Sequence, residues 1–368
     1  MTRVAAFTDT YLPTVNGVTY TIDAWRDHWN DHHGRMDVVY PGTDEYTPSA
    51  HEHPVRSLPF PFYDGVRVGA PRVPKTVPRA DVVHAHTAFG LGLAARRYAA
   101  KHDLPLVASY HTPTAEYAEY ISSYDSVLAG ISTASQTYEH WYYEHADLVI
   151  TPSEPTKRHL VDDLDVTTPV HVVSNGIDTE RFQPAATEAD AFRERFDLDG
   201  TLVGYTGRHG YEKRLEDVID ATDGMDDVTV VFGGDGPARD DLEARAQRAD
   251  VDVRFLGFLD RDDMPAFYSA LDAFAFPSPV ETQGLVALEA NACGTPVAGV
   301  DAGALADTIE HGETGYHYDP GDIDGFQTAI ERTLDDHDRL AANCLDRRDT
   351  FSIEHAVTEL RTHYDTIT

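Results

Sequence analysis

The feature that most constrains the fold is an alternation of short apolar segments with helical patterns, which runs along the chain twice. In the first half, apolar segments of strand length lie at 3–7, 36–40, 81–86, 105–111 and 147–153. Patterns typical of helices lie between them, at 17–29 and 90–102. Strands and helices that alternate in this way predict a parallel sheet with helices on both faces.

The second half repeats the scheme and predicts a second sheet of the same kind. Its expected strands are 202–207, 228–234, 251–257, 273–278, 296–300 and 315–319. Its expected helices are 214–225, 237–249, 263–271 and 284–293, followed by a helical end over 322–368. A chain of 368 residues also exceeds the size that a single hydrophobic core usually reaches.

We therefore expect an α/β protein with two doubly wound, Rossmann-like domains that face each other across a cleft. The expected domains are 1–174 and 175–350, because the turn signal Asn175-Gly176 lies between the halves. Residues 351–368 are expected to form a C-terminal helix that packs back on the first domain. Ligands of open parallel sheets bind beyond the carboxyl ends of the strands, so residues directly after these strands are site candidates.

Two cations follow the first expected strand of the second half. Arg208 comes directly after 202–207, and Lys213 lies near the start of the next helix. Two such cations can converge on a phosphate group, together with backbone amides of the helix start. A solvated helix cap is the alternative. The glycine-rich turn around Gly234 lets the backbone approach a ligand closely, although such turns are common in α/β proteins.

Polar residues also follow the expected strands of the first half. Asn16 and Gly17 directly precede the helix 17–29, so backbone amides there can meet an anion. An ordinary turn is the alternative. His111 lies at the end of another strand, where it can contact a substrate or exchange a proton. A hydrogen-bonded surface histidine is the alternative for His111.

The patterns do not predict a metal site. His84 and His86 are two positions apart and so lie on one face of a strand end, but no further ligand is spaced to complete a metal site with them. Asp-x-Asp pairs can in principle hold a divalent cation on a diphosphate, and several occur in the chain. Four of them do not follow a convincing strand: Asp163/Asp165, Asp197/Asp199, Asp250/Asp252 and Asp322/Asp324.

The stretch ETQGLVALE places two acids, Glu281 and Glu289, around an expected helix start. Glu281 lies in the loop after the strand 273–278, whereas Glu289 lies about a turn and a half into the helix that Gly284 begins. The two acids therefore have different surroundings and can hold two ends of one elongated ligand. Chance spacing in a chain with 63 acidic residues is the alternative.

The composition excludes some partners and compartments. The formal net charge of -34 disfavours nucleic acid and weakens contact with anionic lipid. So acidic a surface, with lysine only at positions 75, 101, 157 and 213, suggests adaptation to concentrated salt. Two cysteines make no disulfide framework, and no stretch is apolar enough for a signal sequence or a membrane span. We expect a cytoplasmic protein that at most lies on a membrane.

Five segments together resemble a known family. They are FTDTYLPTVNGVT, SNGIDTERF, GRHGYEKR, FGGDGP and PSPVETQGLVALEANACGTPV, and they run in family order over nearly the whole chain. The last is similar to the E-x7-E segment of retaining GT-B glycosyltransferases of family 4. Within that family, ETQGL and HTPTAEYAEYI (111–121) resemble enzymes that glycosylate a diacylglycerol-type lipid.

The resemblance implies a role for each candidate residue. The catalytic set is His111, Arg208, Lys213 and Glu281. Arg208 and Lys213 hold the diphosphate of a nucleotide sugar, with Gly234 on the same side. The hexose hydroxyls bind Glu281, helped by the backbone amides of Thr282, Gln283, Gly284 and Leu285. Glu289 binds the nucleotide ribose, and His111 lies near the transferred sugar.

On the acceptor side, the resemblance places Asn16 and Gly17 beside His111, with Gly17 against the donor phosphates or the acceptor. The first domain then binds the acceptor and the second binds the nucleotide sugar, with no cofactor and no metal. Many family members have Gly-Phe where this chain has Thr282-Gln283, which leaves the choice of sugar open. Gln283 fits the lipid subgroup.

The expected function is therefore transfer of a hexose, first of all from UDP-glucose, to a diradylglycerol-type lipid. Alternatives are a transferase that uses GDP-mannose or another donor on a glycan or polyprenyl-linked acceptor, and a non-catalytic nucleotide-sugar binder. Residues 58–80 combine apolar aromatics with basic residues, which suits a membrane interface, although an ordinary Pro-rich loop is the alternative. These residues are Phe60, Phe62, Tyr63, Arg67, Arg72, Lys75 and Arg79.

Overall fold

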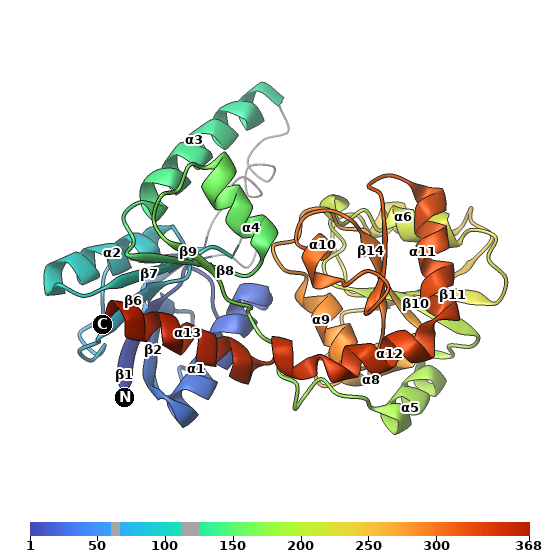
Figure 1. Cartoon of the computed structure of the whole chain (residues 1–368), viewed down its shortest axis with the longest axis horizontal. Helices are drawn as coiled ribbons and strands as arrows, with labels where there is room; N and C mark the ends of the chain where they lie inside the picture. Colours follow the sequence, from blue (N-terminus) through green and yellow to red (C-terminus); the bar gives the residue numbers. More distant parts are fainter. Residues whose placement is uncertain (60–66, 112–124) are drawn as a thin grey trace. The chain divides into compact units, whose positions relative to one another are not determined.

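A computed structural model describes residues 1–59, 67–111 and 125–368, with 125–133 described by their backbone alone (Figure 1). It divides into two compact units. The first contains residues 1–176 together with 353–368, and the second contains 177–352. Phe60, Phe62 and Tyr63 of the expected membrane interface lie outside the described residues, as do residues 112–121 of the segment that resembles lipid-glycosylating enzymes.

The first unit is built on a parallel seven-stranded sheet in the order β3-β2-β1-β6-β7-β8-β9. Its strands are β1 (Thr2–Phe7), β2 (Gly34–Pro41), β3 (Glu52–Val55), β6 (Val82–Ala85), β7 (Leu106–Ser109), β8 (Leu148–Thr151) and β9 (Val170–Val172). The chain moves outward from β1 in one direction and from β6 in the other. The switch point of the sheet therefore lies between the carboxyl ends of β1 and β6, where such sheets bind ligands.

Helices cover both faces of this sheet. On one face, α1 (Gly17–His32) and α13 (Ile353–Ile367) enclose a core that includes Trp25, Trp29 and Tyr364 (Figure 1). On the other face, α2 (Gly90–His102) and α3 (Asp125–Tyr143) pack on a second core. The shorter α4 (Glu154–Arg158) and a π-helical turn (His159–Asp163) follow β8. The C-terminal helix thus packs on the first unit, as predicted.

The second unit has a parallel six-stranded sheet in the order β12-β11-β10-β13-β14-β15. Its strands are β10 (Thr201–Thr206), β11 (Val228–Gly233), β12 (Asp252–Gly257), β13 (Ala273–Phe276), β14 (Val297–Val300) and β15 (Gly315–Tyr318). The helices are α5 (Ala186–Phe196), α6 (Glu216–Thr222), α7 (Arg239–Ala246), α8 (Met264–Ala270), α9 (Leu285–Ala292), α10 (Leu305–Thr308), α11 (Ile323–Asp335) and α12 (His337–Asp346). The predicted fold class, two Rossmann-like parallel sheets, is confirmed.

The boundaries of helices differ from the predictions where a residue adopts a left-handed backbone conformation. The helix expected from 214 begins at Glu216, because Arg214 adopts a left-handed conformation with φ 52° after a 3-10 turn, Tyr211–Lys213. Gly284 does not begin α9 but precedes it, with φ 79°, a conformation that glycine adopts without a steric penalty. The helical end of the chain is broken before α13 by a second 3-10 turn, Arg348–Phe351.

An antiparallel hairpin of β4 (Ser57–Pro59) and β5 (Arg67–Gly69) lies outside the seven-stranded sheet and was not predicted. Its register places Leu58 opposite Val68, and both side chains are exposed. Three-residue strands with apolar residues facing solvent show no alternation of buried and exposed positions. The sequence pattern therefore does not distinguish this hairpin from a Pro-rich loop.

Candidate active site

The switch point of the second sheet lies between β10 and β13, and the loops after these two strands carry most of the predicted donor site. Lys213, after β10, and Glu281, after β13, form an ion pair with Nζ 2.6 Å from Oε1. Their side chains are 19% and 16% exposed, so the pair is screened less than a surface pair. Two residues 68 positions apart in the chain, each predicted separately, are therefore in direct contact.

Arg208 lies on the same loop as Lys213 and forms an ion pair with Glu212, 2.5 Å away. Glu212 was not predicted, because an acid in the sequence EKR is as typical of a helix cap. Glu212 and Glu281 both interact electrostatically with the buried Tyr205 hydroxyl, and Arg208 has the opposite effect on it. Burial first, and then these two carboxylates, raise the pKa of Tyr205 well above its ordinary value. Opposite charges thus gather at this sheet edge.

Glycines let the loops after β10 and β11 approach each other. A Cβ at Gly234 would lie 2.0 Å from the carbonyl oxygen of Gly207, and one at Gly236 would lie 2.6 Å from that of His209. The Gly234 amide donates to the Gly257 carbonyl oxygen at 2.6 Å. The close packing of the loops is therefore enough to explain these glycines, without a ligand contact. A ligand contact at Gly234 remains a prediction.

The loop that carries Glu281 is fixed by the chain after β14. The Ala304 amide donates to the Glu281 carbonyl oxygen at 3.1 Å, and Thr308 Oγ1 donates to the Gln283 carbonyl oxygen at 2.6 Å. Gln283 itself is buried. Thr282, Gln283, Gly284 and Leu285 lead into α9, so the predicted amides do lie at a helix start, one residue later than expected.

Glu289 lies inside the second unit, 5% exposed, rather than on its surface. Its Oε2 accepts a hydrogen bond from the Tyr268 hydroxyl at 2.7 Å, and its Oε1 lies 3.3 Å from Arg261. Burial raises the pKa of this carboxyl, while Arg261 and the Tyr268 hydrogen bond oppose the shift. Arg261 and Tyr268 were not predicted, since the contacts join residues that are distant in the sequence. The ribose contact of Glu289 remains a prediction.

Three buried histidines lie at the carboxyl ends of the strands of the first sheet. His84 lies 2.5 Å from the Tyr364 hydroxyl through Nδ1 and 2.7 Å from Ser109 Oγ through Nε2. His86 Nδ1 lies 3.1 Å from His111 Nε2, and the rings of His84 and His86 stack at 4.0 Å. Among the described residues, no group of three or more metal-ligating side chains is arranged around an ion site.

All three imidazoles are electrically neutral at pH 7. Burial lowers the pKa of His84 to about 3 and that of His111 to about 4, and it lowers the pKa of His86 well below its ordinary value. For His111, a hydrogen bond with Asn175 partly opposes the effect of burial. His111 is therefore a buried histidine in a hydrogen-bonded network, not a surface histidine.

The loop after β1 holds Asn16 and Gly17 at the start of α1. Asn16 Oδ1 accepts from the Thr19 amide at 2.9 Å and so caps the helix, while its Nδ2 donates to Thr10 Oγ1 at 2.9 Å. Both polar ends of the Asn16 side chain therefore already have partners within the fold. The acceptor contacts of Asn16 and Gly17 remain predictions.

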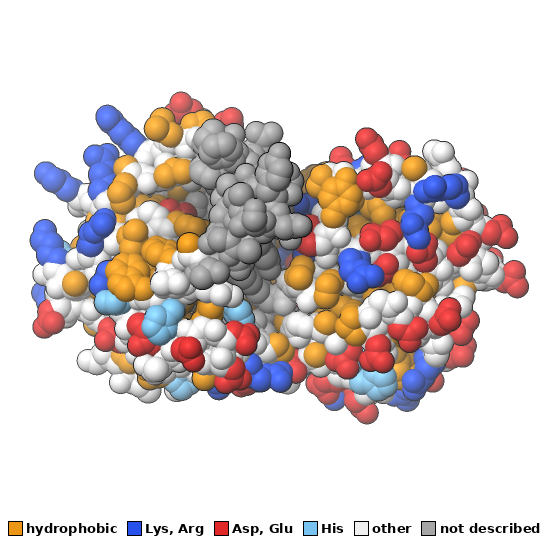
Figure 2. All heavy atoms as spheres, turned by 90° about the horizontal axis from the view of Figure 1, so that it is seen from above, with side chains coloured by type: hydrophobic (Ala, Val, Ile, Leu, Met, Phe, Trp, Pro, Cys, Tyr) orange, Lys and Arg blue, Asp and Glu red, His pale blue; other side chains and the backbone are white. Residues whose placement is uncertain are grey.

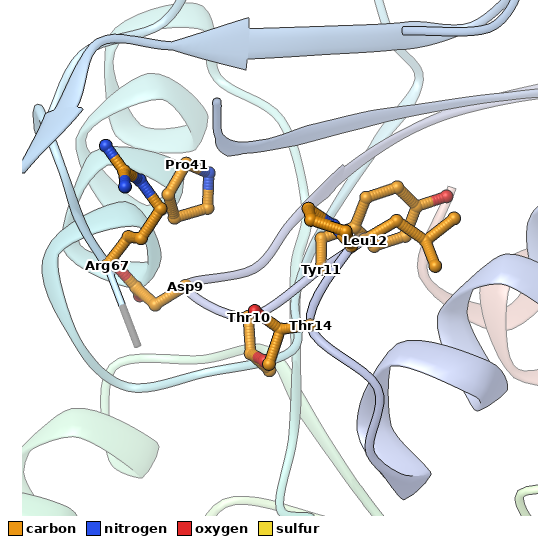
Figure 3. A pocket seen from close by; sticks show the side chains of 8 residues that line it. Asp9, Thr10, Tyr11, Leu12, Thr14, Pro41 and Arg67 are labelled. Atoms are coloured by element: carbon orange, nitrogen blue, oxygen red, sulfur yellow. The ribbon is translucent and has the colours of Figure 1, made fainter. Parts of the chain in front are cut away.

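A pocket with about 280 Å³ of empty space, partly open to solvent, lies beside this loop. Figure 3 shows the Asp9 and Arg67 side chains on one side of it and Tyr11 and Leu12 on the other. The Asp9 carboxylate accepts from Thr87 Oγ1 at 2.7 Å and from the Leu91 amide at 3.0 Å, at the start of α2. Asp9 was not predicted, because one acid after a strand carries no distinctive spacing.

Comparison with known proteins covers both units. Residues 15–181 match the model of glycosyltransferase family 4, and residues 186–347 match that of glycosyl transferases group 1. The chain superposes on a sucrose-phosphate synthase from Thermosynechococcus elongatus with a TM-score of 0.80 and 21% identity, over 100% of this chain and 99% of that one. At this identity the likeness concerns the fold.

Three relatives show how far the sequence similarity extends. A GDP-mannose-dependent alpha-mannosyltransferase of Mycolicibacterium smegmatis is 30% identical over 89% of this chain and 86% of that protein. An alpha-monoglucosyldiacylglycerol synthase of Streptococcus pneumoniae is 29% identical over 80% and 70%. A sulfoquinovosyl transferase of Arabidopsis thaliana is 30% identical over 77% of this chain, which spans only 56% of that relative's length. The chain therefore belongs to the group 1 glycosyltransferases, with an N-terminal domain of family 4 and the GT-B fold.

Proposed function

We propose that the protein is a retaining glycosyltransferase that moves a hexose from a nucleotide sugar, UDP-glucose as first choice, to a diradylglycerol-type membrane lipid without a metal ion. The observation that carries this proposal is the Lys213–Glu281 ion pair at the switch point of the second sheet. A cation and a carboxylate in contact there match a donor with a charged diphosphate beside an uncharged, hydroxyl-rich sugar.

Lys213 and Arg208 are proposed to stabilise the negative charge that develops on the diphosphate as the bond to the sugar breaks. A lysine ammonium has three donors, so Lys213 can keep Glu281 while it binds a phosphate oxygen. Glu281 then accepts hydrogen bonds from hexose hydroxyls. Fixed charges of this kind lower the barrier because they need no reorganisation during the reaction.

The bonding changes balance without a base from the protein. The bond from the anomeric carbon to the phosphate oxygen breaks, and a bond to the acceptor oxygen forms on the same face of the sugar. The departing phosphate oxygen takes the proton of the acceptor hydroxyl. The neutral form of His111 suits this scheme, because an imidazole proposed to lie near the sugar then adds no charge there.

The lipid acceptor is proposed from the resemblance of ETQGL to the lipid subgroup and from similarity to a monoglucosyldiacylglycerol synthase. Among the described residues, no helix is long and apolar enough to cross a bilayer. We propose that the protein works at the cytoplasmic face of a membrane as a peripheral protein. We also propose that its net charge of -34 reflects adaptation to concentrated salt.

A GDP-mannose-dependent transferase is the second candidate, favoured by similarity to the mannosyltransferase of Mycolicibacterium smegmatis. Calorimetric titration with UDP and with GDP distinguishes the two, because only the preferred base should bind tightly. Turnover of labelled donor with and without lipid vesicles then distinguishes a transferase from a nucleotide-sugar binder. Donor turnover that does not depend on lipid would argue against a lipid acceptor.

A further inference from the structure

The basic residues of the chain are concentrated in one segment of the first unit. Residues 56–101 contain eight of the 29 Lys and Arg residues but only two of the 63 Asp and Glu residues. This segment includes the β4–β5 hairpin, the connection to β6, and α2. In a chain with a net charge of -34, so local an excess of positive charge is the opposite of the general trend.

The cations of this segment differ from those of the second unit in their partners. Arg56, Arg72, Lys75, Arg97 and Lys101 are exposed, and none of them forms an ion pair with a residue that the structure describes. In the second unit, which is described throughout, twelve of the 15 Lys and Arg residues form ion pairs with Asp or Glu. The segment's positive charge therefore remains available to an external anion.

Apolar and aromatic side chains are also exposed on the hairpin of this segment and against its helix α2. Leu58 is 74% and Val68 50% exposed, and the hairpin register places them directly opposite each other. β5 contacts α2, and the Arg96 guanidinium of α2 lies 4.6 Å from the ring centre of Trp141, which is 39% exposed. Figure 2 shows Lys and Arg side chains gathered with hydrophobic ones on the first unit (left), whereas acidic side chains predominate on the second unit (right).

We propose that this surface, the basic face, docks the protein on an anionic lipid bilayer. The basic face consists of the exposed side chains of the hairpin, of residues 70–80 and of α2. Basic residues attract anionic head groups, and exposed apolar side chains gain by entering the boundary between head groups and acyl chains. The proposal deepens the proposed function, on which it rests, because it places the membrane that holds the acceptor against the first unit.

A bilayer fits these observations better than a nucleic acid does. Leu58 and Val68 have nothing to bind on a phosphate backbone, whereas insertion into a bilayer removes their apolar surface from water. The remaining surface is strongly acidic, so an anionic bilayer repels it and only the basic face can approach. In concentrated salt the screening length falls to about 3 Å, so attraction acts only at contact and the apolar side chains add to it.

The test is co-sedimentation with vesicles of phosphatidylglycerol and phosphatidylcholine that contain no acceptor lipid, compared with phosphatidylcholine alone. It is made at the lowest salt at which circular dichroism shows a folded protein. The variant Arg72→Glu/Lys75→Glu is compared with Arg158→Glu/Arg248→Glu, which changes the net charge equally at exposed sites outside 56–101. We expect binding to anionic vesicles to fall roughly 30-fold in the first variant and little in the second.

A second variant, Leu58→Ser/Val68→Ser, tests the apolar contribution and should weaken binding most at high salt, where the charges are screened. UDP binding should be unchanged in both basic-face variants, so loss of the docking surface is distinguishable from loss of the proposed activity. Equal binding by Arg72→Glu/Lys75→Glu and its control would overturn the proposal. Tighter binding to single-stranded or duplex nucleic acid than to anionic vesicles would also overturn it.

Discussion

The edges formed by the carboxyl ends of the strands differ between the two sheets, because one carries charged side chains and the other neutral ones. The same strand-to-loop pattern predicts both edges. At the switch point of the second sheet, Lys213 and Glu281 form a charged pair with Arg208 and Glu212 nearby. At the edge of the first sheet, His84, His86 and His111 are neutral imidazoles, because burial lowers their pKa values.

The difference lies in what surrounds each edge. The second sheet's loops are partly open to solvent, so charged side chains remain hydrated while they pair. The histidines of the first sheet are packed against Trp25, and His84 bonds to Tyr364 of the C-terminal helix. A positive charge on these buried rings would have no solvent. A charged edge suits a diphosphate, and an uncharged edge suits a neutral hydroxyl acceptor.

The largest expected effect comes from removing the cation of the charged edge. Lys213→Gln should lower the transfer rate by about 10²–10³-fold, because one fixed donor to the developing charge is lost. Steady-state transfer of labelled hexose measures the effect. Arg254→Gln is the matched control, since it removes one positive charge from an exposed ion pair on β12. Equal rates in the two variants would leave Lys213 without a role in transfer.

A second prediction divides the roles of the two acids. Glu281→Ala should lower transfer by about 10²-fold while UDP affinity changes little, because Glu281 is proposed to hold the sugar. Glu289→Ala should weaken both, since it removes the proposed ribose contact and leaves Tyr268 and Arg261 without their partner. Calorimetry and transfer assays give the two quantities. If both substitutions change them in the same proportion, this division of roles is wrong.

The uncharged edge predicts a pH dependence of stability. A histidine with a lowered pKa stays neutral in the folded protein, while the unfolded chain takes up a proton below pH 6.5. The free energy of unfolding should therefore fall as the pH decreases from 6.5, by about 1.4 kcal/mol per pH unit for each such histidine, until the folded pKa is reached. For His84 that value is about 3.

His84→Gln tests this, since glutamine can still bond to Tyr364 and Ser109 but does not titrate. Denaturant unfolding between pH 6.5 and 5 should show an average slope about 1.1 kcal/mol per pH unit shallower than in the wild type, because the unfolded histidine is only half protonated at pH 6.5. The control is the exposed His102→Gln, which leaves the buried cluster untouched. A slope as steep as that of the wild type would mean that His84 is protonated in the folded protein.

The smallest effect concerns Asn16, where helix capping and acceptor binding lead to different expectations. Asn16→Ala should lower the free energy of unfolding by about 1 kcal/mol, since the cap on Thr19 is lost. Asn16→Asp should restore the stability, because aspartate caps as well. If Asn16→Asp nevertheless raises the acceptor KM, the side chain also contacts the acceptor, as the resemblance implies.

The sequence pattern predicts the fold wherever burial alternates regularly. The helix over 90–102 matches α2, because Leu91, Ala94, Ala95 and Ala99 repeat on one buried face. The hairpin at Leu58 and Val68 was missed, since its apolar residues face solvent. α5 was also missed, because in a mostly polar segment only Ala189 and Phe192 are buried.

The candidate site was predicted by residue type but not by contact. Lys213 and Glu281 each follow a strand, which the sequence shows, yet the bond between them depends on β10 lying beside β13. Tyr268 with Glu289 and His86 with His111 are pairs of the same kind, separated by 21 and 25 residues. Such partners depend on tertiary packing, which no local pattern encodes.

The proposed hexose transfer can be tested by mass analysis of a diradylglycerol lipid extract after incubation with UDP-glucose and either the wild-type protein or Lys213→Gln. With the wild type we expect a lipid heavier by one hexose, and with the variant at most about a hundredth as much. Equal product from both proteins would contradict the claim that the charged edge of the second sheet carries the transfer. Consumption of UDP-glucose without any glycosylated lipid would contradict the lipid acceptor.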